Sequence, residues 1–180
     1  MKHIIYIISA FTALFLSSCN STPDLSEEEV YSIINEIIAL DSLSVYKACW
    51  KFENIQLTDE HSKEFTKEDV VFIKKQNNLF KNSKIKPNKL KWYRKRSKTT
   101  DFITIDTLCN KGILYHISFP LISADRKKVM IEFREDCNCN LGGQGGKFLY
   151  EKRNEHWVFI KMFDRWISDR INKKIEQGAS

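Results

Sequence analysis

The spacing of the apolar residues changes near residue 100, and this change limits the fold more than any other feature of the chain. Before it, five residues recur at the spacing of one helix face: Val30, Ile33, Ile34, Ile37 and Ile38. After it, apolar and polar residues alternate in short runs, as they do in half-buried strands. Helices that precede a group of strands indicate an α+β domain.

Two helices are expected in the first half. Ser26 and Glu29 form a capping box at the start of the first helix, which should end near Asp41. Residues 66–69 resemble a second N-cap, with a short helix continuing to Phe80. The same patterns predict three further segments: a strand within 45–55, and loops over 58–64 and 83–98.

Short connections between the later segments predict an antiparallel meander. Its strands are expected at 102–108, 113–119, 129–136, 148–150 and 156–163. Residues 156–163 are apolar on both faces, which is typical of a central strand. The glycine-rich stretch 137–146 is interpreted as a flexible hairpin loop. We therefore expect an α+β domain, with N-terminal helices packed on one face of a curved antiparallel β-meander sheet.

Residues 4–16 form an apolar stretch that is too short to span a membrane and has the length of a signal-peptide core. It ends in Leu16-Ser17-Ser18-Cys19, which resembles the lipobox of bacterial lipoproteins. The resemblance implies that residues 1–18 are a lipoprotein signal peptide and that Cys19 is lipidated. Asn20, rather than an aspartate, follows this cysteine, so we expect the outer membrane of the cell envelope.

The rest of the chain has the length of one domain. We interpret residues 19–25 as the lipidated cysteine and its tether, 26–168 as a single α+β domain, and 169–180 as a C-terminal tail or short helix. Removal of the signal peptide takes away one lysine and no acid, so the mature chain stays mildly basic. An envelope location argues against nucleic acid as a partner of this basic chain.

Four cysteines remain after lipidation: Cys49, Cys109, Cys137 and Cys139. In an oxidising compartment they are candidate disulfide partners, and four cysteines allow three pairings. Cys137 and Cys139 could instead join His116 and His156 as zinc or copper ligands, although zinc knuckles use a two-residue spacing. A redox pair is also considered, but no thioredoxin-like βαβ unit surrounds it. We expect disulfides or inert thiols, with no metal and no cofactor.

Residues 84–98 carry a run of bases without an acid. The bases are Lys84, Lys86, Lys89, Lys91, Arg94, Lys95, Arg96 and Lys98. On a membrane-tethered protein, such a segment is a candidate site for anionic lipid, lipopolysaccharide or glycan. A solvated loop whose aromatic residues, Trp92 and Tyr93, lie in the core is the simpler interpretation.

Catalytic motifs are scarce. The sequence contains neither Gly-x-Ser-x-Gly nor His-Glu-x-x-His, and the mature chain has three histidines: His61, His116 and His156. Glu132 and Asp136 could share a strand face, but a solvent-facing charge ladder explains them more simply. The glycines of 142–146 precede a predicted strand rather than a helix, which argues against a phosphate-binding loop.

Several motifs of the second half occur together in one pattern. They are Ile117-Ser118-Phe119-Pro120, residues 123–127, Cys137, Gly143-Gln144-Gly145, residues 149–152, Trp157 and Trp166-Ile167-Ser168, with residues 65–69 and Gln76 upstream. This pattern, over roughly residues 60–168, resembles a group of small secreted or lipid-anchored proteins of Bacteroidota. The resemblance implies an envelope protein and brings no catalytic chemistry. The closely spaced Cys137 and Cys139 depart from the pattern, so it gives these cysteines no role.

These features favour a non-enzymatic, lipid-anchored binding or accessory domain of the cell envelope. An immunity or inhibitor protein that acts on an envelope toxin or lytic enzyme is the alternative, because small lipoproteins often have that role. An enzyme is the least favoured class, since the sequence shows no catalytic constellation. The expected partners are a membrane through the N-terminal lipid, an anionic lipid or glycan, and a protein.

Overall fold

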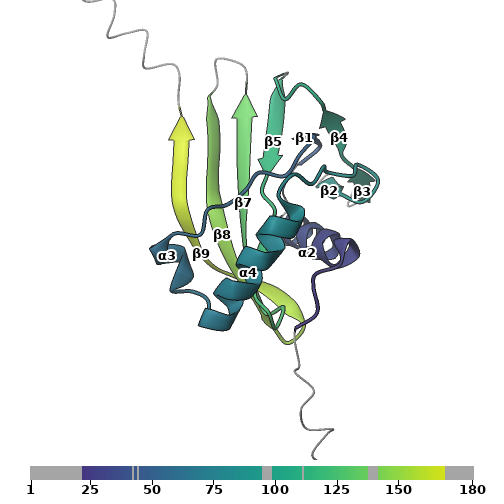
Figure 1. Ribbon diagram of the computed structural model, residues 1–180. Coiled ribbons are helices and arrows are strands. Elements are labelled where there is room, and N and C mark those ends of the chain that lie inside the picture. Colours follow the sequence, from purple (N-terminus) through teal and green to yellow (C-terminus); the bar gives the residue numbers. More distant parts are fainter. Residues whose placement is uncertain are drawn as a thin grey trace, which may run out of the picture.

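The computed structural model shows a curved sheet accompanied by a few helices (Figure 1). The described residues are 22–41, 43, 45–94, 99–110, 112–137 and 142–168. The predicted signal peptide, Cys19 and the tail at 169–180 lie outside these ranges. Within the described part of the chain, no helix is long and apolar enough to cross a membrane. The predicted α+β class is confirmed, and most of the structure is sheet.

Reciprocal capping explains where the two longer helices begin. α2 (Glu27–Leu40) follows Ser26, whose hydroxyl accepts a hydrogen bond from the backbone N–H of Glu29. The carboxylate of Glu29 in turn accepts from the backbone N–H of Ser26, as the sequence predicts. α4 (Lys67–Phe80) has the same arrangement after Thr66. Both helices therefore begin within a residue of their predicted starts.

Two short elements lie where the sequence predicts loops. α3 (Asp59–Ser62) begins after Thr58, whose hydroxyl accepts from the backbone N–H of His61. β2 (Lys91–Arg94) pairs with β3 (Thr99–Phe102) in a separate antiparallel sheet. Both loop predictions are therefore wrong in these parts. One helical turn and one four-residue strand are too short to show a period in the sequence.

The large sheet combines a meander with a parallel insertion. Its strands are β1 (Lys47–Cys49), β4 (Thr104–Asp106), β5 (Ile113–Ile117), β6 (Leu121–Ile122), β7 (Lys128–Cys137), β8 (Gly143–Arg153) and β9 (His156–Ser168). The order is β4-β1-β5-β7-β8-β9, and β6 pairs with β7. The β5-β7-β8-β9 part is antiparallel, as expected for a meander. β1 lies between β4 and β5 and runs parallel to both, which the sequence does not predict.

The two faces of the sheet belong to different hydrophobic clusters. Val129 and Ile131 of β7 share a cluster with Ile34 of α2. Met130, between them, points to the other face and shares a second cluster with Ile73 of α4. Figure 1 shows α4 in front of the strands. α4 contributes to both clusters, since its Phe72 belongs to the first one, together with Ile34 of α2.

The N-terminal end of α2 is fixed to the turn between β6 and β7. Arg126 Nε donates to Glu29 Oε1 at 3.0 Å, and Arg126 Nη2 donates to the carbonyl of Pro23 at 2.7 Å. Leu25, which the sequence assigns to the tether, is 5% exposed, and its N–H donates to Gln76 Oε1 at 3.2 Å. The packed part of the chain therefore begins before residue 26.

β9 forms an edge of the large sheet, so the expectation that residues 156–163 form a central strand is wrong. Among the described residues, β9 pairs with β8 alone. Val158, Phe159 and Ile160 are 37–47% exposed. The apolar pattern on both faces is present, but the second neighbouring strand that it predicts is not part of the described chain.

Candidate functional site

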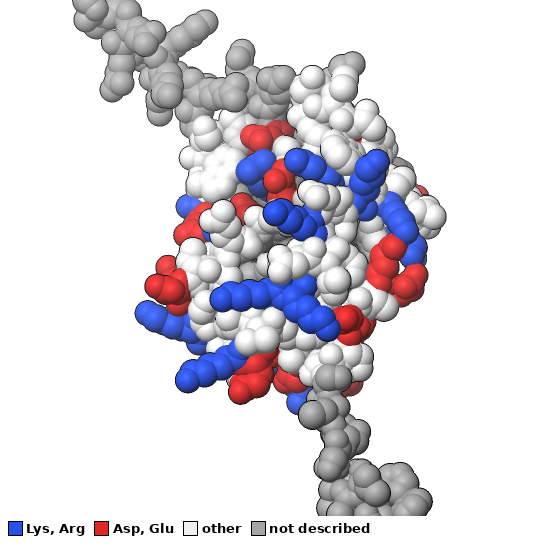
Figure 2. Space-filling model, viewed as in Figure 1, with Lys and Arg blue, Asp and Glu red and all other residues white. Residues whose placement is uncertain are grey.

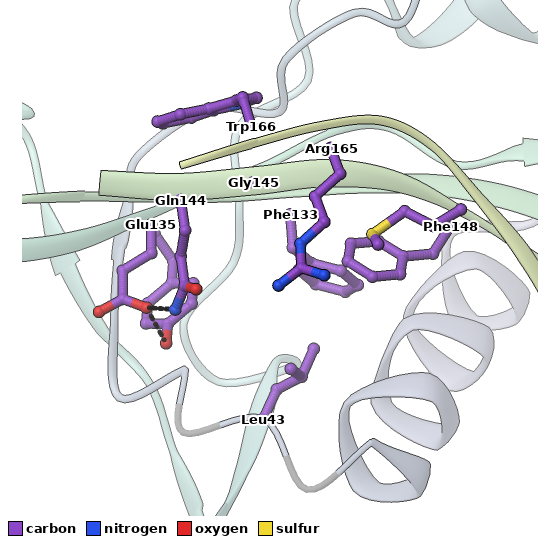
Figure 3. Close-up of a pocket in the computed structure, with 10 residues that line it drawn as sticks. Leu43, Phe133, Glu135, Gln144, Gly145, Phe148, Arg165 and Trp166 are labelled. Atoms are coloured by element: carbon purple, nitrogen blue, oxygen red, sulfur yellow. Dashed lines mark hydrogen bonds between the residues drawn. The ribbon is translucent and has the colours of Figure 1, made fainter. Parts of the chain in front are cut away.

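A pocket of about 250 Å³ lies between the sheet and the segment that follows α2. We call it the α2–sheet pocket. Its walls come from β5, β7, β8 and β9, and Leu43 closes the opposite side. Figure 3 shows the side chains of Phe133, Phe148 and Arg165 extending toward the space next to Leu43. The pocket thus combines an aromatic wall with a cationic group.

A carboxylate is the main acceptor in the pocket wall. Glu135 Oε2 accepts from the hydroxyl of Tyr115 at 3.1 Å and from Gln144 Nε2 at 3.0 Å. Burial raises the pKa of the Tyr115 phenol above its ordinary value, and the charge of Glu135 raises that pKa further. The phenol therefore stays protonated at neutral pH and remains a donor to Glu135.

Arg165 is the one basic residue among those that line the pocket. Its guanidinium has no hydrogen bond or ion pair with any described residue. In Figure 3 it lies beside the rings of Phe133 and Phe148. A planar guanidinium offers five N–H donors and binds carboxylate, sulfate or phosphate through paired hydrogen bonds. With apolar walls beside it, the arrangement suits an anion that is attached to an apolar group.

Two glycines of β8 make room for the indole of Trp166. A Cβ at Gly145 would lie 2.9 Å from Trp166 Nε1, and a Cβ at Gly143 would lie 2.6 Å from the carbonyl oxygen of Glu135. The glycine-rich stretch therefore enters the sheet at Gly143, which corrects the predicted flexible loop. In Figure 3, Trp166 lies on the opposite side of the strands from Leu43, so it supports the pocket wall from behind.

Replacing Gly143 with alanine is expected to lower the free energy of unfolding by about 1–3 kcal/mol, because the methyl group collides with backbone that has little freedom to move. Urea unfolding followed by tryptophan fluorescence measures the change. Arg153→Ala is the control on the same strand, since the side chain of Arg153 is exposed and a surface substitution changes stability by at most about 0.5 kcal/mol. A Gly143→Ala variant as stable as the control would contradict this packing role.

One disulfide joins two of the four candidate cysteines among the described residues. Cys49 of β1 and Cys109, after β4, form a disulfide across a sequence separation of 60, with a Cα–Cα distance of 5.0 Å. Asp106 Oδ1 accepts from the backbone N–H of Cys109 at 3.0 Å. A hydrogen bond from Lys47 holds the pKa of the Asp106 carboxyl below its ordinary value. The disulfide therefore links the inserted strand β1 to the segment that follows β4.

The residues considered as metal ligands are not assembled within the described chain. His156 begins β9 opposite Arg153, whereas Cys137 ends β7 opposite Ile113, near the other end of the sheet. Only the backbone of Cys137 is described, and Cys139 lies outside the described residues. Among the residues that are described, no group of three His, Cys, Asp or Glu side chains could hold a metal ion.

His116 belongs to a charged cluster on the face opposite the α2–sheet pocket. Its Nδ1 lies 3.2 Å from Glu53 Oε1, and its Nε2 lies 3.7 Å from Asp136 Oδ2. Arg134 Nε is 3.5 Å from the same Asp136 oxygen. Glu53 and His116 therefore extend the charge ladder expected around Asp136. His116 does not line the α2–sheet pocket, nor the pocket between α2 and Phe119.

The bases of segment 84–98 are partly balanced by acids at the start of α2. Lys86 Nζ lies 2.7 Å from Glu27 Oε2, and Lys89 Nζ lies 2.9 Å from Glu27 Oε1 and 2.7 Å from Glu28 Oε1. Hydrogen bonds from Lys86 and then Lys89 hold the pKa of the Glu27 carboxyl below its ordinary value. These acids belong to a helix more than fifty residues earlier, so the charge pattern of segment 84–98 does not reveal them.

Two further bases of this segment contact aromatic rings rather than acids. Lys84 and Lys91 lie over aromatic rings, 5.5 Å from the centre of Trp50 and 5.9 Å from the centre of Phe102. Figure 2 shows basic and acidic side chains interspersed over the visible face of the molecule. The other four bases either lie outside the described residues or have no described side chain: Arg94, Lys95, Arg96 and Lys98.

Comparisons of the chain with protein-family models, with curated proteins and with solved structures find no match. The α2–sheet pocket is therefore the candidate site on geometry alone. Its polar residues come from four strands and meet through register, in which Tyr115 faces Glu135 and Glu135 faces Gln144. The alternation along β7 was the one sequence signal, because it places Phe133 and Glu135 on the same face.

Proposed function

We propose that the chain is a lipid-anchored, non-enzymatic binding domain of the cell envelope, whose α2–sheet pocket binds a small apolar molecule bearing an anionic group. The observation that carries the proposal is Arg165, whose guanidinium has no partner among the described residues and lies beside Phe133 and Phe148. Glu135 keeps free lone pairs for a hydroxyl or amino group of the same ligand. The volume of about 250 Å³ favours a compact ligand.

The proposed anchor and the pocket belong to opposite ends of α2. Arg126 fixes Pro23 next to the start of the helix, and Leu43 follows its end. A helix of 14 residues spans about 21 Å. Between Cys19 and Pro23 the chain can extend at most about 14 Å. A lipid on Cys19 would hold the start of α2 close to the membrane, so the ligand would reach the pocket from the aqueous side.

The probe for this pocket is 1-anilinonaphthalene-8-sulfonate, which combines aromatic rings with a sulfonate. We expect saturable binding of one probe molecule per chain, with a rise in fluorescence as the rings leave water. Arg165→Gln is expected to raise the dissociation constant about tenfold, because a hydrogen bond to a charged group contributes roughly 1.5–3 kcal/mol. Fluorescence titration at constant ionic strength measures both values.

Arg153→Gln is the matched control for this titration. Arg153 is an exposed arginine of β8 that is already paired with Glu151 at 2.7 Å, and it does not line the pocket. This variant should bind the probe like the native chain. Equal dissociation constants for the Arg165→Gln, Arg153→Gln and native proteins would remove Arg165 from the site and contradict the proposal.

An additional proposed contact is an anionic surface on the basic segment. In a chain freed of its lipid by Cys19→Ala, we expect a fourfold glutamine variant at Lys84, Lys91, Arg94 and Arg96 to weaken binding to anionic vesicles at least about 100-fold, at roughly 1 kcal/mol per base. The control removes four exposed lysines around α4: Lys63, Lys67, Lys74 and Lys81. A co-sedimentation assay in which both variants bind equally would discard this contact.

Lipid anchoring itself is tested by the intact mass of the protein from purified envelopes. We expect a chain that starts at Cys19 and carries diacylglycerol, with or without a further acyl group. A mass equal to the full 180 residues, or to a shortened chain without acyl groups, would contradict the proposed anchor.

A further inference from the structure

The face of the large sheet opposite the α2–sheet pocket carries a row of residues from four neighbouring strands, which we call the cross-strand row. His116 of β5 lies opposite Arg134 of β7. Arg134 lies opposite Gly145 of β8, which in turn lies opposite Trp166 of β9. Residues opposite one another in a sheet direct their side chains to the same face. Figure 1 shows that α4 leaves the ends of β7 and β9 without a helix in front of them.

The indole of Trp166 lies on β8, where two glycines leave room for it. A Cβ at Gly145 would lie 2.9 Å from Trp166 Nε1, and a Cβ at Gly143 would lie 3.2 Å from Trp166 Cη2, so the ring extends over both residues. In Figure 3 the ring is seen nearly edge-on and runs parallel to the strands. The side chain is half-buried, and no other aromatic ring or cation contacts it among the described residues. One face of the indole therefore rests on the glycines, and the other is directed away from the sheet.

Polar groups flank this ring on the side of β7. Asp136 Oδ1 lies 3.3 Å from the same Gly143 position that Trp166 Cη2 approaches, so the carboxylate and the indole are neighbours. Arg134 lies between the carboxylates of Glu53 and Asp136, at 3.9 Å and 3.5 Å. These contacts are too long for good hydrogen bonds, and Arg134 Nε has no hydrogen-bond partner among the described residues. The guanidinium therefore keeps N–H donors for a ligand beside the ring.

We propose that this patch binds a neutral saccharide, with one face of a pyranose ring stacked on the outer face of the Trp166 indole. A pyranose ring presents C–H bonds on its face and hydroxyl groups around its edge. The C–H bonds suit the partly negative face of an aromatic ring. At the edge, neighbouring hydroxyls would donate to the Asp136 carboxylate and accept from the Arg134 guanidinium.

The charges around Arg134 favour a neutral ligand over other classes. An anion at this patch would be repelled by Glu53 and Asp136, which lie on either side of the arginine. An apolar ligand would take these charged groups out of water without a new partner, which costs free energy. Hydroxyl groups carry no net charge and pair with a carboxylate and a guanidinium alike. The patch is separate from the α2–sheet pocket, so the inference does not depend on the ligand there.

The test is an NMR titration of the isotope-labelled, full-length protein with three neutral trisaccharides: maltotriose, cellotriose and chitotriose. We expect at least one of them to shift the indole N–H signal of Trp166 saturably. Trp166→Phe identifies this signal by its absence. Arg134→Gln and Asp136→Asn are each expected to raise the dissociation constant about tenfold, because each removes a hydrogen bond between the saccharide and a charged group.

Two variants outside the patch are the matched controls. Phe102→Ala removes an exposed aromatic ring of β3, and Arg153→Gln removes an exposed arginine of β8. Both should bind the saccharide like the native chain. Arg134→Gln and Asp136→Asn should still bind 1-anilinonaphthalene-8-sulfonate normally, which shows that they are folded and separates this site from the α2–sheet pocket.

Three results would overturn the proposed saccharide site. The first is that none of the trisaccharides shifts the Trp166 signal. The second is that the shifts persist with unchanged dissociation constants in Arg134→Gln and Asp136→Asn. The third is that an acidic alginate trisaccharide binds at Trp166 more tightly than every neutral one, since the patch would then select a charged ligand.

Discussion

Replacing Cys49 and Cys109 with serine is expected to lower the free energy of unfolding by about 4 kcal/mol. The disulfide closes a loop with a sequence separation of 60, and the loss of loop-closure entropy in the unfolded chain gives this magnitude. Cys49 is 1% exposed, so its replacement also places a hydroxyl in the core. Urea unfolding of the native and double-serine proteins measures the difference.

A reductant provides the internal control for this prediction. Dithiothreitol should destabilise the native protein toward the value of the double-serine variant, and it should change the variant itself by much less. If reduced and oxidised native protein unfold at the same urea concentration, the disulfide has no part in fixing β1 and the prediction is contradicted.

Replacing Tyr150 with alanine is expected to lower the free energy of unfolding by about 3–5 kcal/mol, the range for deleting a large aromatic side chain from a core. Tyr150 is 0% exposed and its hydroxyl donates to Asp41 Oδ2, at the end of α2. Burial, together with the Asp41 carboxylate, raises the pKa of the phenol, so it remains a donor. The side chain therefore joins the helix end to β8, next to Leu43 of the pocket.

Tyr150→Phe separates packing from this hydrogen bond. It keeps the ring and its edge contact with Phe159, and removes only the hydroxyl that donates to the Asp41 carboxylate, so a loss of about 1.5–3 kcal/mol is expected. Thermal or urea unfolding by circular dichroism gives both values. Alanine and phenylalanine variants of equal stability would show that the ring does not anchor the core here.

The positions of the two longer helices could be predicted because their determinants are local. Ser26 and Thr66 each cap a helix through residues three positions later, and both pairs are visible in the sequence. The antiparallel meander follows in the same way from alternation and short connections. By contrast, β1 is only three residues long and is held between β4 and β5 by long-range pairing, so no local pattern reveals its place.

The glycines and the last strand were misinterpreted for an identifiable reason. Gly143 and Gly145 look like a flexible loop in sequence, but the absent side chains make space for Trp166, which lies about twenty residues later. The apolar residues of β9 predict neighbours on both sides, whereas the described residues supply only β8. Both cases depend on contacts that only the folded protein creates.

The candidate site was the least predictable part. Tyr115, Glu135, Gln144 and Arg165 share no motif, and the register of four strands brings them together. Irregular pairing of β8 with β9 between Gly145 and Lys147 also breaks simple alternation near Arg165. A count of apolar and polar positions therefore cannot place this arginine on the pocket face.

The most direct test of the central claim is an amide chemical-shift map of the isotope-labelled protein titrated with 1-anilinonaphthalene-8-sulfonate. The α2–sheet pocket predicts that the largest shifts fall on Leu43, Glu135, Gln144, Phe148 and Arg165. They should saturate together at one probe per chain. Shifts centred on the His116 cluster or on β2 and β3, or no saturable shifts at all, would contradict the claim that this pocket is the binding site.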